Sequence, residues 1–176
     1  MSVAFRREGD EEHKEPRFEL PIPAGPNLVT RRGLRLIAAR VASLEAQIAR
    51  ETDETALADA QRRLRYWRTR QATAQLAPVP PRDQVAFGSR VTFRHRGADR
   101  TIDIVGDDEA DPAAGRIAFS APLARALIGA CPGDLADFGG EPDAIEIVAT
   151  EAIEDQAASC SSASLASSHC ASAASS

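Results

Sequence analysis

The sequence predicts an α+β protein. It would consist of an N-terminal antiparallel helical hairpin, which forms a short coiled coil, followed by an antiparallel sheet domain with one helix. Three observations predict this. Apolar residues spaced by 3 and 4 occur in two consecutive runs within residues 30–76. Apolar residues alternate with a period of two after residue 81. Residues 156–176 are almost entirely Ser and Ala, a composition that cannot bury a core, so we expect a disordered tail.

The first helix of the hairpin is predicted to begin at Thr30 and to end near Arg50. The Thr30 hydroxyl can accept a hydrogen bond from a free N–H of the first turn, which favours an N-cap. Gly33 is unfavourable inside a helix, by about 1 kcal/mol relative to Ala. The predicted apolar seam of this helix is Leu34, Ile37, Val41, Leu44 and Ile48.

The second helix is predicted over residues 56–76, after an acidic turn at about 51–55. Pro78, Pro80 and Pro81 would end it and form a stiff linker. Its predicted seam is Leu57, Ala60, Leu64, Trp67, Gln71 and Ala74. Arginines are expected on the outer faces of both helices, where they form either a solvated surface or a contact surface for an acidic cleft: Arg31, Arg35, Arg40, Arg62, Arg63, Arg65, Arg68 and Arg70.

The remainder of the chain is predicted to form short strands around one helix. The helix is predicted at residues 122–128, with Pro122 in the first turn, where its missing N–H has no cost. An acidic loop is expected at residues 106–115. The predicted strands are residues 84–87, 89–95, 100–105, 117–119, 136–138 and 144–148.

Charge divides the 176 residues into unlike parts, although the net charge is only −5. Residues 27–76 carry 10 basic and 5 acidic side chains, whereas residues 77–155 carry 7 and 15. An acidic domain is a poor partner for a phosphate backbone, so we expect a protein partner rather than direct nucleic-acid binding.

We also expect no membrane association and a monomeric, cytoplasmic protein. The expected organisation is a polar, proline-rich arm (1–26), the hairpin (27–77), the sheet domain (82–153) and the tail (156–176).

The sequence carries none of the common catalytic or phosphate-binding motifs. We therefore expect no catalytic residue, no metal site and no cofactor of its own, and an enzyme is not expected. The acidic turn is the one cluster that suggests chemistry. Its carboxylates can coordinate a hard cation at the active site of another protein, or they can simply suit a helix N-terminus. The candidates are Glu51, Asp53, Glu54 and Asp59, and the loop at residues 107–111 has the same ambiguity.

Several runs resemble bacterial transcription elongation factors of the Gre type. Residues 29–34 (VTRRGL) are similar to the start of the hairpin of that family, residues 104–111 (IVGDDEAD) to its IVGxDEAD stretch, and residues 122–129 (PLARALIG) to the block that follows. The resemblance covers about residues 27–150. It implies an FKBP-like C-terminal domain that docks on RNA polymerase, and a hairpin that enters the secondary channel of the polymerase. In full-length members, the acidic tip helps to hold the catalytic Mg²⁺ during cleavage of backtracked RNA.

Two departures refine what the resemblance implies. About three heptads are missing around the tip, which shortens the reach by about 15 Å, so Asp53 and Glu54 are candidate metal-chelating acids on a shortened probe. The docking loop corresponds to Ser120, Ala121, Pro122 and Leu123, with alanine in place of the serine that the family has before the proline. The short hairpin is similar to the Rnk-type regulators of nucleoside diphosphate kinase. The expected function is modulation of transcription elongation through the secondary channel, with stimulation of transcript cleavage as the less favoured variant. The alternative is a coiled-coil interaction module without polymerase activity.

Overall fold

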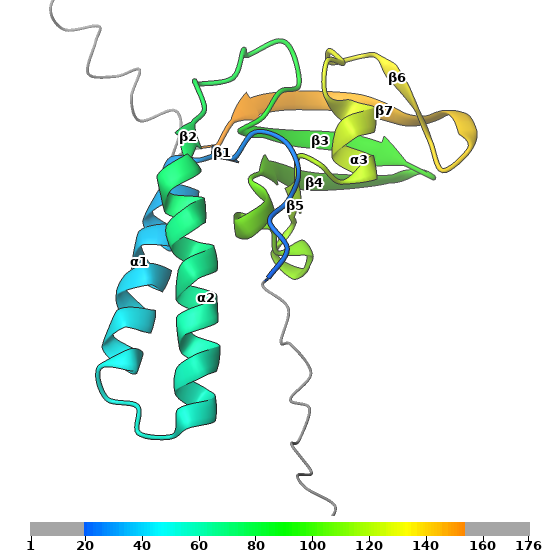
Figure 1. Cartoon of the computed structure of the whole chain (residues 1–176). Helices are drawn as coiled ribbons and strands as arrows, with labels where there is room; N and C mark the ends of the chain where they lie inside the picture. The colour runs from blue at the N-terminus through cyan, green and yellow to red at the C-terminus, as the bar shows by residue number, and fades with distance from the viewer. Residues whose placement is uncertain (1–19, 154–176) are drawn as a thin grey trace, which may run out of the picture.

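The computed structural model describes residues 20–153, in which a helical hairpin projects from the end of a sheet domain (Figure 1). The predicted tail, and residues 1–19 of the predicted arm, lie outside the described residues. The helices and the sheet confirm the predicted α+β class, and the helical hairpin lies at the N-terminal end of the described chain. None of the helices within residues 20–153 is long and apolar enough to cross a bilayer.

The hairpin consists of α1 (Arg31–Ile48) and α2 (Glu54–Thr73). Thr30 is the N-cap of α1, as predicted, and its hydroxyl accepts a hydrogen bond from the Gly33 N–H over 2.9 Å. The centre of the predicted seam is confirmed, but its ends differ because Leu34 is 40% exposed and Gln71 is exposed. The buried seam residues are Ile37, Val41, Leu44, Ala60 and Leu64, with Ile48 and Trp67 packed beside them.

The predicted end of the second helix is wrong. α2 ends at Thr73, and residues 75–76 form strand β2 (Gln75–Leu76), which pairs in parallel with β1 (Leu28–Val29). The Gln75 N–H donates to the carbonyl of Asn27, and the Ala77 N–H donates to the carbonyl of Val29. These bonds hold the segments that enter and leave the hairpin side by side, so the two helices share one rigid base.

The sheet has the strand order β5-β4-β3-β7-β6 and is mixed rather than wholly antiparallel, because β5 runs parallel to β4. Its first predicted segment, residues 84–87, is not a strand. The other predicted strands are present, and the last one is much longer than expected. The bounds are β3 (Ser89–His95), β4 (Ala98–Val105), β5 (Arg116–Ala118), β6 (Leu135–Phe138) and β7 (Glu141–Ala152).

Helix α3 (Pro122–Leu127) covers one face of the sheet and closes the core of the domain (Figure 1). Ala124 and Leu127 are fully buried there, against apolar side chains of the central strands. The sheet residues of this core are Val91, Phe93, Ile104, Ala136, Ile145 and Ile147. The opposite face carries ion pairs, among them Arg94 with Asp99 and Glu146. The alternation predicted for these strands is therefore what separates the core from solvent.

The predicted acidic loop contains two short 3-10 helices, η1 (Asp107–Glu109) and η2 (Pro112–Ala114). η1 contacts both α1 and β5. The loop therefore lies between the hairpin and the sheet domain, and it is not a free surface loop.

Candidate functional site

The acidic tip of the hairpin is built mainly from capping interactions. Asp53 is the N-cap of α2, and its Oδ1 accepts the Ala56 N–H over 2.8 Å. The carboxylate of Glu51 accepts the N–H groups of Thr52 and Asp53. Both carboxylates satisfy N–H groups that would otherwise lack partners at the turn, because the first N–H groups of a helix have none within it. Asp53 and Glu51 thus have structural roles whatever else they do.

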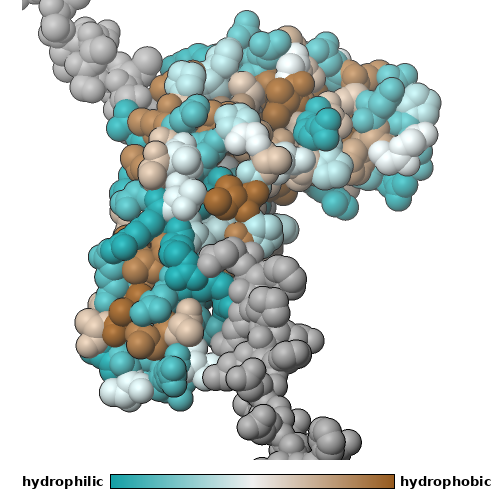
Figure 2. Space-filling view, viewed as in Figure 1, coloured by the Kyte–Doolittle hydropathy of each residue, from teal (hydrophilic) through white to brown (hydrophobic). Residues whose placement is uncertain are grey.

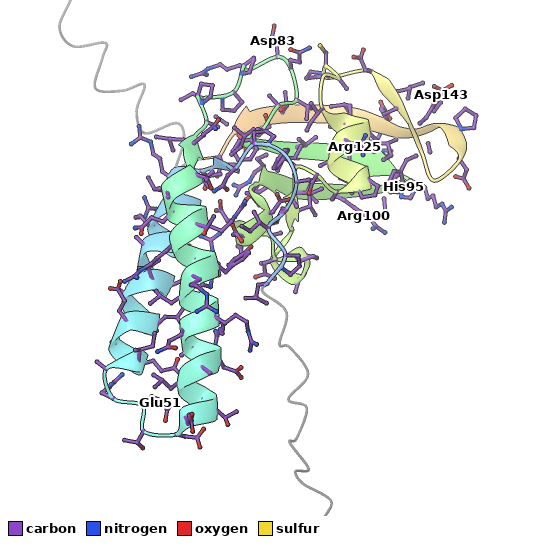
Figure 3. All side chains as sticks on the ribbon, viewed as in Figure 1. Glu51, Asp83, His95, Arg100, Arg125 and Asp143 are labelled. Carbon is purple, nitrogen blue, oxygen red and sulfur yellow. The ribbon has the colours of Figure 1, made fainter. Side chains whose placement is uncertain are left out.

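The tip lies at the end of the hairpin that is remote from the sheet, where Figure 3 labels Glu51. Glu54 is in the first turn of α2 and is exposed, together with Asp53. Asp59 forms an ion pair with Arg62 one turn further on. Within residues 20–153, no group of three or more His, Cys, Asp or Glu side chains could hold a metal ion. The arms of 18 and 20 residues are about 27–30 Å long at 1.5 Å per residue.

The base of the hairpin holds a buried ion pair that the sequence analysis missed. Arg70, predicted on the outer arginine face, is 2% exposed, and its Nε donates to a carboxylate oxygen of Asp108, which is 9% exposed. The hydroxyl of Tyr66, one turn earlier on α2, donates to the other oxygen of Asp108 over 2.6 Å. One aspartate of η1 is therefore bound by two side chains of α2.

This environment raises the pKa of Tyr66 to about 12. The first cause is burial, which disfavours the charged phenolate. The hydrogen bond to Asp108 and the negative charge of that carboxylate add to the rise, while Arg70 opposes it. The phenol remains a proton donor to Asp108 at every physiological pH.

Glu109 makes the equivalent contact with α1. Its carboxylate is buried, accepts the hydroxyl of Thr30, and lies 3.3 Å from Nη1 of Arg32. A carboxylate at a helix N-terminus is favourable because unpaired N–H groups give that end a partial positive charge. Adjacent residues of η1 therefore bind opposite arms of the hairpin, Asp108 to α2 and Glu109 to α1.

Two glycines allow this close approach. A Cβ on Gly33 would lie 2.8 Å from Oε2 of Glu109, and a Cβ on Gly106 would lie 2.6 Å from the carbonyl oxygen of Leu28. The glycine that is unfavourable for helix formation is therefore the residue that makes room for Glu109. Gly33 ends the TRRG run and Gly106 precedes the DDE run. These two glycines are the sequence signal from which the close contact between η1 and the hairpin could have been inferred.

The predicted docking loop is at the start of α3. Pro122 occupies the first turn and is exposed, and Ala121 is an N-cap that offers no side-chain hydrogen bond. Ser120 is exposed and its hydroxyl donates to Asp107 of η1, whereas Leu123 packs partly against the core. Ser120 and Pro122 are thus available to a partner, and the loop is connected to the same 3-10 helix that holds the hairpin.

Most of the other arginines predicted on the outer faces of the hairpin are exposed, and Arg62 is the exception. Figure 2 shows hydrophilic side chains over much of the hairpin on the visible face. Arg62 is partly covered beside Asp59, and Arg68 pairs with Glu45 between the two helices. The arginines that are exposed are Arg31, Arg35, Arg40, Arg63, Arg65 and Arg68.

Residues 80–151 match the sequence profile of the family described as "Transcription elongation factor, GreA/GreB, C-term". The match includes η1, the docking loop and all of the five-stranded sheet except the last residue of β7. This part of the chain is therefore similar to the C-terminal domain of Gre-type factors.

Curated relatives show the same similarity. A 53-residue stretch is 55% identical to transcription elongation factor GreA of Vibrio parahaemolyticus and covers 29% of this chain and 34% of that protein. A 56-residue stretch is 46% identical to GreA of Legionella pneumophila and covers 31% and 35%. The matching region spans about a third of the length of these curated relatives.

Solved structures of similar proteins overlap only loosely with the chain. The GreA factor homolog Gfh1 of Thermus thermophilus has a TM-score of 0.34 at 16% identity, covering 72% of this chain and 99% of that one. A GreA/GreB factor from Nitrosomonas europaea has a TM-score of 0.34 at 19% identity, covering 72% and 98%. Such low TM-scores carry no information about the site.

Proposed function

We propose that this protein is a transcription factor that binds bacterial RNA polymerase and modulates elongation through the secondary channel. The observation that carries the proposal is the rigid attachment of a basic helical hairpin to a Gre-type C-terminal domain by buried contacts at η1. The domain supplies the docking surface, and the fixed hairpin supplies a probe whose direction is set by that docking. The factor is a partner of an enzyme rather than an enzyme itself.

Occupation of the channel is favoured over transcript cleavage. A cleavage factor must place carboxylates within a few tenths of an ångström of a metal-coordinating position. The arms are about 27–30 Å long, and Asp53 already uses one carboxylate oxygen as a cap. Any Mg²⁺ involved would be that of the polymerase, with Asp53 and Glu54 as the only tip acids proposed to approach it. The short arms are also why we group the chain with the Rnk-type branch.

A pull-down of RNA polymerase by the full chain tests the docking surface. Pro122→Glu places a charge on the exposed loop at a helical first turn, where an acid is tolerated, so folding is retained. Pro112→Glu is the matched control, because Pro112 has the same first-turn position in η2 and is also exposed. We expect polymerase to co-purify with the wild type and the control, and retention to fall at least about tenfold for Pro122→Glu. Failure of the wild type to retain polymerase would refute the proposal.

A cleavage assay on backtracked complexes tests the role of the tip. The variant Asp53→Asn/Glu54→Gln removes both charges while Asn preserves the N-cap. The matched control is Asp83→Asn/Glu141→Gln, at exposed positions outside the hairpin. We expect wild type, variant and control to give the same low cleavage while all three alter pausing. Strong cleavage by the wild type that is lost only in the tip variant would instead assign a catalytic role to Asp53 and Glu54.

The competing function is a coiled-coil interaction module that does not bind polymerase. The seam favours the polymerase factor, because its central residues are buried between α1 and α2 of the same chain. Within the described hairpin, the seam residues left for a second copy are at the seam ends, such as Leu34. Light scattering should therefore give the mass of a monomer, and a stable dimer mass would favour the competing function.

A further inference from the structure

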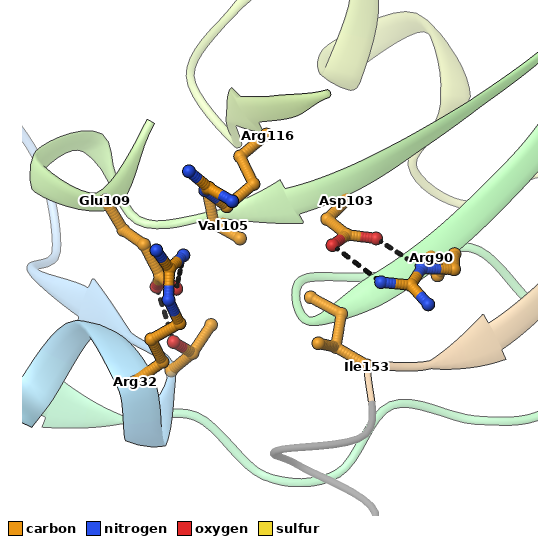
Figure 4. Close-up of a pocket in the computed structure, with 8 residues that line it drawn as sticks. Arg32, Arg90, Asp103, Val105, Glu109, Arg116 and Ile153 are labelled. Atoms are coloured by element: carbon orange, nitrogen blue, oxygen red, sulfur yellow. Dashed lines mark hydrogen bonds and ion pairs between the residues drawn. The ribbon is translucent and has the colours of Figure 1, made fainter. Parts of the chain in front are cut away.

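A cavity of about 310 Å³ opens between the base of the hairpin and the polar face of the sheet (Figure 4). Three arginines reach it from three different elements: Arg32 from α1, Arg90 from β3 and Arg116 from β5. Two carboxylates, Asp103 and Glu109, also line it, so the lining carries one net positive charge. Neither the docking loop nor the hairpin tip contributes to this cavity.

Both carboxylates are already engaged. Asp103 receives a two-pronged contact from Arg90, with N···O distances of 2.7 and 3.0 Å. Glu109 accepts the Thr30 hydroxyl and lies at the N-terminus of α1. Their negative charge is therefore largely compensated locally, and they hold the walls of the cavity in place.

The guanidinium of Arg116 has unused capacity in the described structure. Its Nη2 donates to Asp111 over 2.7 Å, but its Nε is buried and has no hydrogen-bond partner among residues 20–153. A buried donor without a partner is costly, so a site that leaves one is a candidate for a ligand. Arg32 contacts Glu109 through a single long 3.3 Å pair, and its side chain is 43% exposed.

We propose that this cavity binds a small phosphate-bearing molecule. Guanidinium groups match the geometry of phosphate oxygens, and a phosphate has terminal oxygens enough for arginines that approach from several directions. The volume exceeds that of a bare anion and is at the lower end of the range for small-molecule sites, so the ligand carries a compact organic group as well as the phosphate. Binding joins Arg32 of the hairpin to Arg116 of the domain and stabilises their relative orientation.

Calorimetric titration of the full chain with pyrophosphate, AMP and glutarate tests this site. Arg32→Gln and Arg116→Gln each remove one proposed contact, and Arg32→Gln alters an exposed side chain, so at least that variant keeps its fold. Arg40→Gln is the matched control, because it removes the same charge from an exposed position further along α1. We expect pyrophosphate or AMP to bind wild type and control alike, and each pocket variant to bind about tenfold or more weakly.

Three outcomes would overturn the proposal. The first is the absence of heat with both phosphate compounds. The second is equal binding by wild type and the two pocket variants, which would indicate general attraction to the basic surface. The third is equal or tighter binding of glutarate, which would indicate a carboxylate site such as one for an acidic peptide. Thermal melting of the same proteins is an independent readout, because a ligand that bridges hairpin and domain raises the melting temperature by mass action.

Discussion

Arg70 and Asp108 form a buried ion pair across the junction of the hairpin and the sheet domain, although they are 38 positions apart in the sequence. The pair is completed by Tyr66 on the free oxygen of Asp108. Because Asp108 belongs to η1 and Ser120 bonds to the neighbouring Asp107, the hairpin, η1 and the docking loop are physically continuous. These contacts therefore set the direction of the hairpin relative to the sheet domain.

Breaking this pair from either side should strongly destabilise the protein. Arg70→Met leaves the Asp108 carboxylate buried without its cation, and we expect a loss of about 3–5 kcal/mol in the free energy of unfolding. Asp108→Asn should have a similar effect, and the double variant should lose less than the sum by more than about 1 kcal/mol, because the residues share one interaction. Urea unfolding measures all three.

Arg68→Met is the control for that cycle. Arg68 forms a solvent-exposed ion pair with Glu45. Such exposed pairs contribute about 1 kcal/mol or less to the free energy of unfolding. Strict additivity of Arg70→Met and Asp108→Asn would contradict the pairing.

The phenol of Tyr66 should lose its proton at a higher pH than an ordinary tyrosine does. Tyr66 is the one tyrosine of the chain, so the absorbance change of tyrosinate reports it alone. We expect a midpoint near pH 12 in the folded protein, against about 10 for an unfolded tyrosine. Between pH 10 and pH 12 the folded protein keeps the phenol proton of Tyr66, whereas the unfolded chain loses it. The stability contributed by Tyr66 is therefore complete below pH 10 and is lost as the pH rises towards 12. Asp108→Asn should move the midpoint towards 10, and an unchanged midpoint would exclude Asp108 as a cause.

Gly33→Ala should destabilise the protein even though alanine is the better helix former. The new methyl group would lie 2.8 Å from Oε2 of Glu109, which is buried and cannot swing into solvent. We expect a loss of about 1–3 kcal/mol, where an open helical site would gain about 1 kcal/mol. In a Glu109→Ala background the same change should become neutral or stabilising. Thermal or urea unfolding of the wild type, the two single variants and the double variant measures these changes in stability. Destabilisation by Gly33→Ala in both backgrounds would rule out the clash with Glu109.

Asp53 should show its capping role in a pair of variants. Asp53→Ala removes the acceptor for the Ala56 N–H and should cost about 1 kcal/mol. Asp53→Asn keeps an acceptor and should cost only a few tenths. Unfolding measurements separate the two, and an equal loss would mean that charge rather than capping is what matters at this position.

The local pattern of the chain was readable because it depends on neighbours in the sequence. The 3-and-4 spacing predicted α1 and most of α2, the Thr30 cap was identified from its type and position, and the alternation around Val91 and Phe93 predicted a strand that faces the core. The predicted end of α2 is wrong because β2 exists only through its pairing with β1, which no local pattern reveals.

The candidate site was readable only in part. The acids of the tip were identified from composition, but the structure gives Asp53 and Glu51 capping roles that depend on the geometry of the turn. The sequence predicts Arg70 on an outer face of the hairpin, together with arginines that are exposed in the structure. Its burial depends on Asp108, and the sequence does not show that residues 107–111 contact the hairpin.

Without any structure, one can predict the class of fold, the hairpin with its acidic tip, and the resemblance of residues 104–129 to a family of transcription factors. These follow from residue type and spacing along the chain. The folded chain is needed to show which charges are buried, that Gly33 and Gly106 bring η1 against the hairpin, and that three arginines meet in one cavity. Those facts depend on contacts between segments far apart in the sequence. Whether a charged side chain is buried changes its energy more than which charged residue it is.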